Sequence, residues 1–228
     1  MTRTDVRAKF LSSNYPENLR VSEELHPTET ITTIYIIRHG HTEPTENGKL
    51  YNDPDVELTE RGKEQAKALG EWLAKEKPDI LLSSTARRVV STASLIAEKL
   101  GIKNIPQKGL DEWSVGEWEG RTYLEVKKED PEDYKSWASD PIKNAPPGGE
   151  SIEDLHHRVR GRIKELVAEH KGKTIALVTH AGVTRSILVE SLEMPVRNFW
   201  RLNISTGSVS KIDVSDSFTT VQYTNFKP

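Results

Sequence analysis

The chain alternates between short apolar runs and longer amphipathic segments. The run Ile-Thr-Thr-Ile-Tyr-Ile-Ile at 31–37 is too short for a typical helix and too apolar for a loop, so it predicts the first buried strand. The apolar run within 174–179 predicts a central parallel strand that is covered on both faces. Two shorter runs, at 79–82 and 102–105, predict further strands. Together these runs supply the strands of a predicted sheet.

Helical periodicity fills the segments between these strands. Polar residues at the first position can cap helices over 59–76 and 151–170. Apolar stripes predict two more helices, over 85–100 and 182–192. Strands that alternate with helices predict an α/β fold, here a three-layer α/β/α sandwich with a mostly parallel central sheet.

Three other parts of the chain depart from this alternation. Residues 1–30 are polar and interrupted by proline, which predicts an irregular N-terminal extension before a single domain over 31–228. Residues 121–150 end in a proline- and glycine-rich stretch and predict a lid-like insertion. At the end of the chain, 208–214 and 218–223 alternate apolar and polar residues around a short polar turn, which predicts a C-terminal β-hairpin.

Composition narrows the classes of function. The 228 residues are 35% hydrophobic and 29% charged, which suits one folded α/β domain. The net charge of −3 provides no positive field for nucleic acid or for a membrane surface. Cysteine is absent, so disulfides, thiolate metal sites and cysteine nucleophiles are excluded. No apolar run resembles a secretory signal or a membrane span, so we expect a cytoplasmic protein. The sequence leaves open whether the protein forms a homodimer.

The ends of three predicted strands carry cationic side chains. Arg38 and His39 end the first strand, His180 ends the strand over 174–179, and Arg88 follows the strand over 79–82. The carboxyl ends of parallel strands share one rim of the sheet, where ligands bind in such folds. Guanidinium groups match phosphate oxygens, so this rim predicts a site for a tetrahedral dianion. Arg88 also lies in the first turn of its helix, where the helix dipole favours an anion.

These strand ends belong to an ordered series of motifs that resembles the histidine phosphatase superfamily, also called the phosphoglycerate mutase-like family. The motifs are Arg38-His39-Gly40-x-Thr42, Leu58-Thr59-Glu60-Arg61-Gly62-x-x-Gln65-Ala66, Ser83-Ser84-x-x-x-Arg88-x-x-x-Thr92-Ala93, Leu110-x-Glu112-x-x-x-Gly116-x-x-Glu119-Gly120, Gly149-Glu150-Ser151 and Val178-Thr179-His180-Ala181-Gly182. The fourth motif, from Leu110 to Gly120, is compact and in this respect resembles the phosphatase branch of the superfamily. The resemblance implies a phosphohydrolase that needs neither a metal nor another cofactor and that acts on a small-molecule phosphate ester.

The resemblance also implies the catalytic roles. His39 would be the nucleophile that forms a phosphohistidine, and Glu112 would donate a proton to the leaving group. Arg38, Arg88 and His180 would hold the phosphoryl oxygens. Phosphoryl transfer has a loose transition state, so positioning and charge neutralisation dominate its catalysis. Neighbouring cations also favour the neutral form of His39, which keeps a lone pair for attack.

Four further positions are predicted to contact substrate. Ala181 would contribute its backbone N–H, whereas Thr42 would either contact phosphate or cap a turn. Many members of the family carry asparagine three residues after this threonine. Here Thr45 occupies that position and Asn47 lies two residues beyond it, so both are candidates for the contact. His41 is interpreted as a polar loop residue.

Competing interpretations exist for both the site and the function. Arg87 competes with Arg88, and Asp111 and Glu117 compete with Glu112, although motif spacing favours Arg88 and Glu112. The leading function is a phosphomonoesterase for a small phosphorylated metabolite, and the alternative is a phosphoglycerate mutase primed by 2,3-bisphosphoglycerate. A metal-dependent hydrolase built on His39-x-His41 and a non-catalytic phosphate-binding protein are weaker alternatives.

One prediction concerns histidines outside these motifs. His156 and His157 occupy adjacent positions in the predicted helix over 151–170. Both are interpreted as solvated residues on its polar face.

Overall fold

The computed structural model describes residues 29–228, so nearly all of the predicted N-terminal extension lies outside the described residues. The strands are β1 (Thr32–Arg38), β2 (Ile80–Ser83), β3 (Asn104–Pro106), β4 (Thr174–Thr179), β5 (Val209–Val214) and β6 (Thr219–Phe226). The α-helices are α2 (Glu43–Glu46), α3 (Glu60–Glu76), α4 (Arg87–Leu100), α5 (Tyr123–Glu129), α6 (Pro131–Ser139), α7 (Ile152–Glu169) and α8 (Ala181–Ser191). The described residues also contain two 3₁₀ helices, η2 (Gly116–Trp118) and η3 (Val196–Arg201).

The six strands form one sheet in the order β3-β2-β4-β1-β5-β6. Strands β1 to β4 pair in parallel, as the sequence predicted. The predicted mostly parallel sheet is confirmed only for these strands, because β5 pairs antiparallel with both β1 and β6. The predicted C-terminal hairpin is therefore present and forms one edge of the sheet. Its first strand, β5, lies beside β1. The connection between β5 and β6 is tight, and two neighbouring strands joined in this way run antiparallel.

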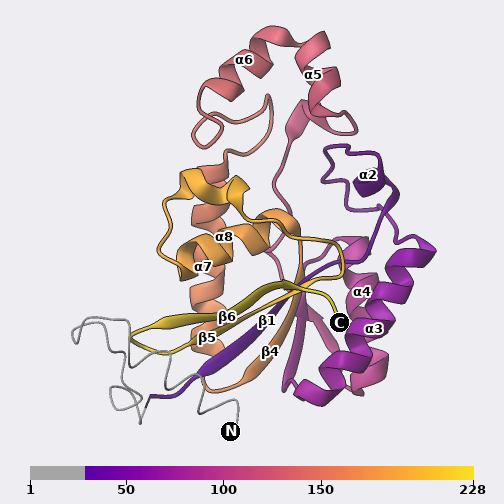
Figure 1. Ribbon diagram of the computed structural model, residues 1–228, viewed down its shortest axis with the longest axis vertical. Coiled ribbons are helices and arrows are strands. Elements are labelled where there is room, and N and C mark those ends of the chain that lie inside the picture. Colours follow the sequence, from indigo (N-terminus) through magenta and orange to yellow (C-terminus); the bar gives the residue numbers. More distant parts are fainter. Residues whose placement is uncertain (1–28) are drawn as a thin grey trace, which may run out of the picture. The chain divides into compact units, whose positions relative to one another are not determined.

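Helices cover both faces of the sheet, which confirms the three-layer α/β/α fold (Figure 1). Successive side chains of a strand point to opposite faces. Ile34 and Ile36 of β1 therefore enter the core formed with α7 and α8, whereas Tyr35 and Ile37 enter the core formed with α3 and α4. Because both faces are buried, β1 is apolar at consecutive positions instead of alternating with polar residues.

Polar caps set the starts of the long helices. The Thr59 hydroxyl accepts a hydrogen bond from the Gly62 N–H at the start of α3, and Ser151 accepts one from the Asp154 N–H at the start of α7. The helix predicted from residue 85 begins two residues later, at Arg87. Thr85 does not cap it, because its hydroxyl donates to Asp111 instead.

The insertion predicted over 121–150 contains two short helices, α5 and α6, which lie together beyond the end of the sheet (Figure 1). Thr122 and Glu125 form a capping box that starts α5. The Trp137 ring of α6 packs 5.3 Å from the Tyr123 ring and 5.4 Å from the Trp118 ring, measured between centroids. Aromatic packing thus holds the insertion together.

Candidate active site

The last residue of β1 leads directly into a buried histidine. The side chain of His39 is 2% exposed, and its Nδ1 lies 2.8 Å from the carbonyl oxygen of Gly40. A carbonyl oxygen only accepts hydrogen bonds, so Nδ1 carries the proton and Nε2 keeps its lone pair.

A pair of close backbone contacts fixes the loop after His39. A Cβ on Gly40 would collide with the Gly62 carbonyl, and a Cβ on Gly62 would collide with the His41 carbonyl. Glycine is therefore required at both positions, where the loop lies against the start of α3.

Parallel pairing brings the second predicted histidine beside the first. Arg38 of β1 pairs with Thr179 of β4, so the residues that follow them, His39 and His180, are neighbours. Their ring centroids are 5.5 Å apart and the ring planes meet at 69°. His180 is fully buried at the N-cap of α8. The two histidines are thus neighbours at the rim where the parallel strands end, as predicted.

Both predicted arginines lie at the same rim. The Arg88 Nη2 donates to the His180 Nδ1 at 3.2 Å, its Nη1 donates to the Asp53 carbonyl at 2.7 Å, and its guanidinium lies 4.8 Å from the centroid of the Tyr51 ring. The Arg38 Nη1 donates to the Ile204 carbonyl at 2.6 Å. Within residues 29–228, the buried Nε–H of each arginine lacks an acceptor. Buried donors without partners are costly, so these groups favour an anionic ligand.

Two side chains that the sequence did not assign to the site lie behind His180. The His180 Nε2–H donates to the Ser84 hydroxyl at 3.0 Å, and this hydroxyl donates to the Asp111 carboxylate at 3.1 Å. Thr85 donates to the same carboxylate oxygen at 2.8 Å. Because Nε2 carries the proton, the His180 Nδ1 remains an acceptor beside Arg88. Ser84 follows β2 directly, and this position was the sequence signal that could have identified it.

Glu112 is held by backbone N–H groups. Its carboxylate accepts from the Gly182 N–H at 3.0 and 3.2 Å and from the Trp113 N–H at 3.0 Å. A Cβ on residue 182 would displace this carboxylate, so the glycine leaves room for Glu112 at this place. Arg158 of α7 donates to the Asp111 carbonyl at 3.1 Å and thereby fixes the loop that carries Glu112.

The other predicted contacts lie around the rim. The hydroxyl groups of Thr42, Thr45 and Tyr51 are mutually 2.8 Å apart and form a hydroxyl cluster. Ala181 is the first residue of α8, and N–H groups in the first turn of a helix lack intrahelical acceptors. Asn47 is exposed at the end of α2, and its side chain makes no hydrogen bond to any residue within 29–228. Substrate contacts by these residues remain predictions.

His41 is a structural residue. Its Nδ1 lies 2.9 Å from the Thr59 hydroxyl, and its Nε2 lies 3.9 Å from Glu46. The described part of the chain contains no cluster of three histidine or carboxylate side chains that could hold a metal ion. Within 29–228, every helix is too short or too polar to span a bilayer.

The surroundings of the two predicted site histidines favour the neutral form of both rings. Burial, followed by the charges of Arg38 and Arg88, lowers the pKa of His39 well below the ordinary value of 6.5. Burial, followed by the charge of Arg88, lowers the pKa of His180 in the same direction. In His39 this state leaves the Nε2 lone pair available for nucleophilic attack.

These lowered pKa values predict a dependence of stability on pH. In the unfolded chain both histidines gain a proton near their ordinary pKa, whereas in the folded protein they stay neutral. The unfolded state therefore binds more protons below this pH, and the free energy of unfolding falls as the pH falls. Each histidine contributes up to about 1.4 kcal/mol per pH unit.

Urea denaturation between about pH 7 and about pH 5.5 measures this slope. The variant His39→Gln should reduce it, whereas His157→Gln, which changes an exposed histidine, serves as the control. A slope that is equal in the wild type and in His39→Gln would contradict the assignment.

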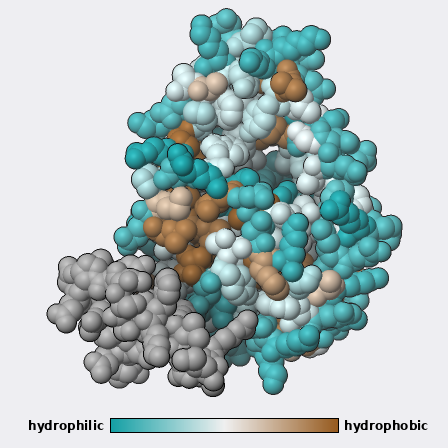
Figure 2. Space-filling model, viewed as in Figure 1, coloured by the Kyte–Doolittle hydropathy of each residue, from teal (hydrophilic) through white to brown (hydrophobic). Residues whose placement is uncertain are grey.

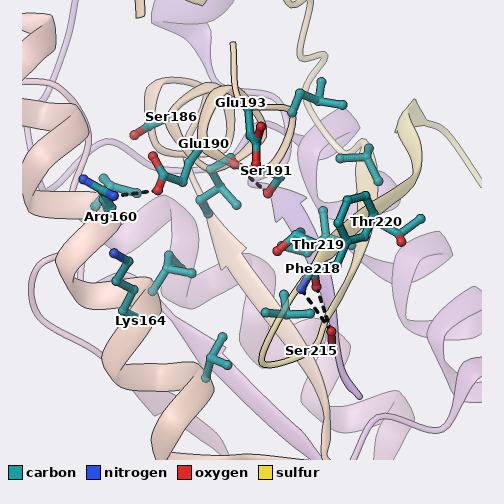
Figure 3. Close-up of a pocket in the computed structure, with 18 of the residues that line it drawn as sticks. Arg160, Lys164, Ser186, Glu190, Ser191, Glu193, Ser215, Phe218, Thr219 and Thr220 are labelled. Atoms are coloured by element: carbon teal, nitrogen blue, oxygen red, sulfur yellow. Dashed lines mark hydrogen bonds and ion pairs between the residues drawn. The ribbon is translucent and has the colours of Figure 1, made fainter. Parts of the chain in front are cut away.

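A separate groove of about 890 Å³ lies away from the predicted catalytic residues. Two of its lining residues, Ile212 and Val214, pair with Ile34 and Thr32 of β1, toward the start of that strand, whereas His39 follows its end. Figure 3 shows Arg160 of α7 meeting Glu190 of α8 in this groove, at 2.7 Å. Figure 2 shows a hydrophobic patch over α7 and α8 on an otherwise mostly hydrophilic face. The groove contains none of the predicted site residues.

Comparisons with known proteins agree with the motifs. The model of the histidine phosphatase superfamily (branch 1) matches residues 34–227. Phosphoserine phosphatase 1 of Hydrogenobacter thermophilus is 31% identical over 183 residues, which cover 80% of this chain and 87% of that protein. The adenosylcobalamin/alpha-ribazole phosphatase of Salmonella typhimurium is 30% identical over 192 residues, which cover 84% of this chain and 95% of that protein.

A solved structure supports the same assignment. The alpha-ribazole phosphatase of Shigella flexneri matches with a TM-score of 0.79 and 29% identity, over 86% of this chain and 96% of that one. These relatives are phosphatases, as the motif series implied for this chain. The chain belongs to the histidine phosphatase superfamily, branch 1.

Proposed function

We propose that this protein hydrolyses a small phosphate monoester through a phosphohistidine on His39. The observation that carries the proposal is the state of the His39 imidazole. Its Nδ1–H is bound by the Gly40 carbonyl, and its neutral ring lies among Arg38, Arg88 and His180. This arrangement combines a free lone pair with groups that neutralise phosphate charge.

In the first step, the Nε2 lone pair of His39 attacks phosphorus as the bond to the ester oxygen breaks. The electron pair of that bond leaves on the ester oxygen, which takes the proton of the Glu112 carboxyl group. Arg38 and Arg88 hold the phosphoryl oxygens, whose charge is spread in the loose transition state. His180 joins them when its Nε2–H turns from the Ser84 hydroxyl to a phosphoryl oxygen, and the Ser84–Asp111 pair holds this N–H until the ester binds.

In the second step, water replaces the alcohol. Glu112, now a carboxylate, accepts a proton from water as the water oxygen attacks phosphorus. The N–P bond breaks and returns its electron pair to Nε2 of His39. Free phosphate then leaves and the enzyme is restored.

The substrate is proposed to be a small metabolite, because the relatives are named for phosphoserine and alpha-ribazole. The mutase alternative shares the same phosphate site and differs only in the acceptor of the phosphoryl group. The cytoplasmic location and the homodimer stay predictions from the sequence.

A phosphoester panel in the presence of EDTA tests the function. Phosphate release with chelator present, from p-nitrophenyl phosphate and from several metabolite monoesters, is the expected result. Isomerisation of 3-phosphoglycerate that exceeds phosphate release would favour the mutase. Activity that EDTA abolishes and zinc restores would favour the metal-dependent alternative, and no release from any ester would overturn the proposal.

A further inference from the structure

A third arginine, which the sequence did not single out, lies next to the proposed site. Arg185 is on α8, one turn after Ala181 and on the same side of the helix. Its Nε donates to the Leu202 carbonyl at 2.9 Å. Its guanidinium lies 5.6 Å from the centroid of the Phe199 ring and 5.5 Å from that of the Trp200 ring. The side chain is thus anchored at Nε and held against aromatic rings.

The outer part of this guanidinium lacks an anionic partner. Within residues 29–228, no carboxylate forms an ion pair with Arg185, and neither of its Nη groups donates a hydrogen bond. Burial lowers the pKa of Arg185 despite the opposing charge of Glu112. A ligand that supplies the missing charge would bind these free donors and stabilise the partly buried cation.

Two observations place Arg185 beside the phosphate site. Arg38 donates to the Ile204 carbonyl and Arg185 donates to the Leu202 carbonyl, so the same backbone segment anchors both arginines. Carbonyls two residues apart in an extended chain are about 7 Å from one another. In addition, Gly182, in the turn of α8 before Arg185, binds the Glu112 carboxylate. Arg185 therefore lies on the leaving-group side of the site, near the proton donor.

We propose that Arg185 binds a carboxylate of the substrate, so that the natural substrates are small phosphomonoesters whose alcohol part carries a carboxylate. The inference rests on the proposed function, in which Arg38, Arg88 and His180 hold the phosphoryl group. The two free Nη groups of one guanidinium match the two oxygens of one carboxylate. A second phosphate would need more positive charge than this one side chain provides. The rings of Phe199 and Trp200 beside it are uncharged, and the other cation that acts on it, Arg38, is assigned to the phosphoryl group.

Matched substrate pairs test this proposal. O-phosphoserine and O-phosphoethanolamine differ only in the carboxylate, as do 3-phosphoglycerate and 2-hydroxyethyl phosphate. For at least one pair, kcat/KM should favour the carboxylated member by about 10- to 100-fold, as expected for a charged hydrogen bond. In Arg185→Gln this ratio should fall to nearly 1. Arg185→Lys should retain part of the preference, because it keeps the charge and loses the fork.

The design also includes a charge-matched control variant and a measurement of phosphate binding. Lys164→Gln removes the same charge from the exposed side of α7 and should preserve the wild-type ratio. The inhibition constant of inorganic phosphate reports an intact phosphate site, and if Arg185→Gln fails to fold, Arg185→Lys carries the test.

Several results would overturn the inference. Wild-type ratios near 1 for both pairs, or ratios that Arg185→Gln leaves unchanged, would do so. If Arg185→Gln lost activity only on ethylene glycol bisphosphate, Arg185 would be assigned to a second phosphate group instead of a carboxylate. If the protein hydrolyses p-nitrophenyl phosphate but shows no preference for carboxylated esters, only the carboxylate site is rejected. If it hydrolyses no ester at all, the proposed function is rejected.

Discussion

Replacing His39 with alanine is expected to abolish phosphate release and to lower kcat by roughly 10⁴-fold or more, the scale seen when a nucleophile is removed. The reason is the loss of Nε2, the atom proposed to accept the phosphoryl group. Rapid alkaline quenching during turnover of a labelled ester should trap a phosphoryl label on the wild type that is stable in alkali and is lost in acid. The variant should show no such label.

The controls for this experiment come from the same chain. His157→Ala changes an exposed histidine of α7 and should retain both the activity and the label. Binding of inorganic phosphate by His39→Ala, measured calorimetrically, would show that the arginines remain in place. Full turnover by His39→Ala, or a label that persists in it, would exclude His39 as the nucleophile.

Replacing Glu112 with glutamine is expected to lower kcat/KM by about 10²- to 10⁴-fold on alkyl phosphates, because their alkoxide leaving groups need a proton. On p-nitrophenyl phosphate, whose leaving group is a stable anion, the loss in kcat/KM should be far smaller. Measuring kcat/KM for both kinds of ester with the wild type and with Glu112→Gln provides the comparison, because kcat/KM does not include the later hydrolysis of the phosphohistidine, which is the same for both esters. The dependence on the leaving group separates proton donation from a purely structural role.

Glu117→Gln is the matched control, because Glu117 is a nearby exposed carboxylate in η2 that competed with Glu112 in the sequence. It should have little effect on either kind of ester. An equal loss on both esters in Glu112→Gln would indicate that Glu112 only supports the fold through Gly182 and Trp113.

Much of the fold could be predicted because burial leaves a clear pattern in the sequence. The strands β1 and β4 are covered on both faces, so their apolar runs are continuous. The two helices of the insertion were not predicted, because α5 has seven residues and Pro131 starts α6 directly after it. Helices this short have too few turns for a recognisable apolar stripe, and aromatic packing stabilises them instead.

The prediction for His156 was wrong. The residue is 7% exposed, and its Nδ1 lies 3.0 Å from the Ser186 hydroxyl of α8. It was assigned to the polar face of its helix, and that face is covered by a neighbouring helix that carries polar partners. His157 is exposed, as predicted.

The centre of the candidate site could be located because parallel strands align their ends. His39 and His180 follow paired residues of β1 and β4, so a sequence with recognisable strands suffices to bring them together. Tyr51, Asp53 and Arg185 were missed for different reasons. The first two lie in a loop whose path has no periodic signal, and the importance of Arg185 depends on the distant residues that surround it.

The contact between Gly40 and Gly62 limits how this enzyme can be altered. Any larger residue at either position would push the first motif away from α3 and displace His39. Substitutions in the insertion or around Arg185, in contrast, leave this contact intact. In the function and the carboxylate site proposed above, the chemical step and the choice of alcohol thus depend on separate parts of the chain.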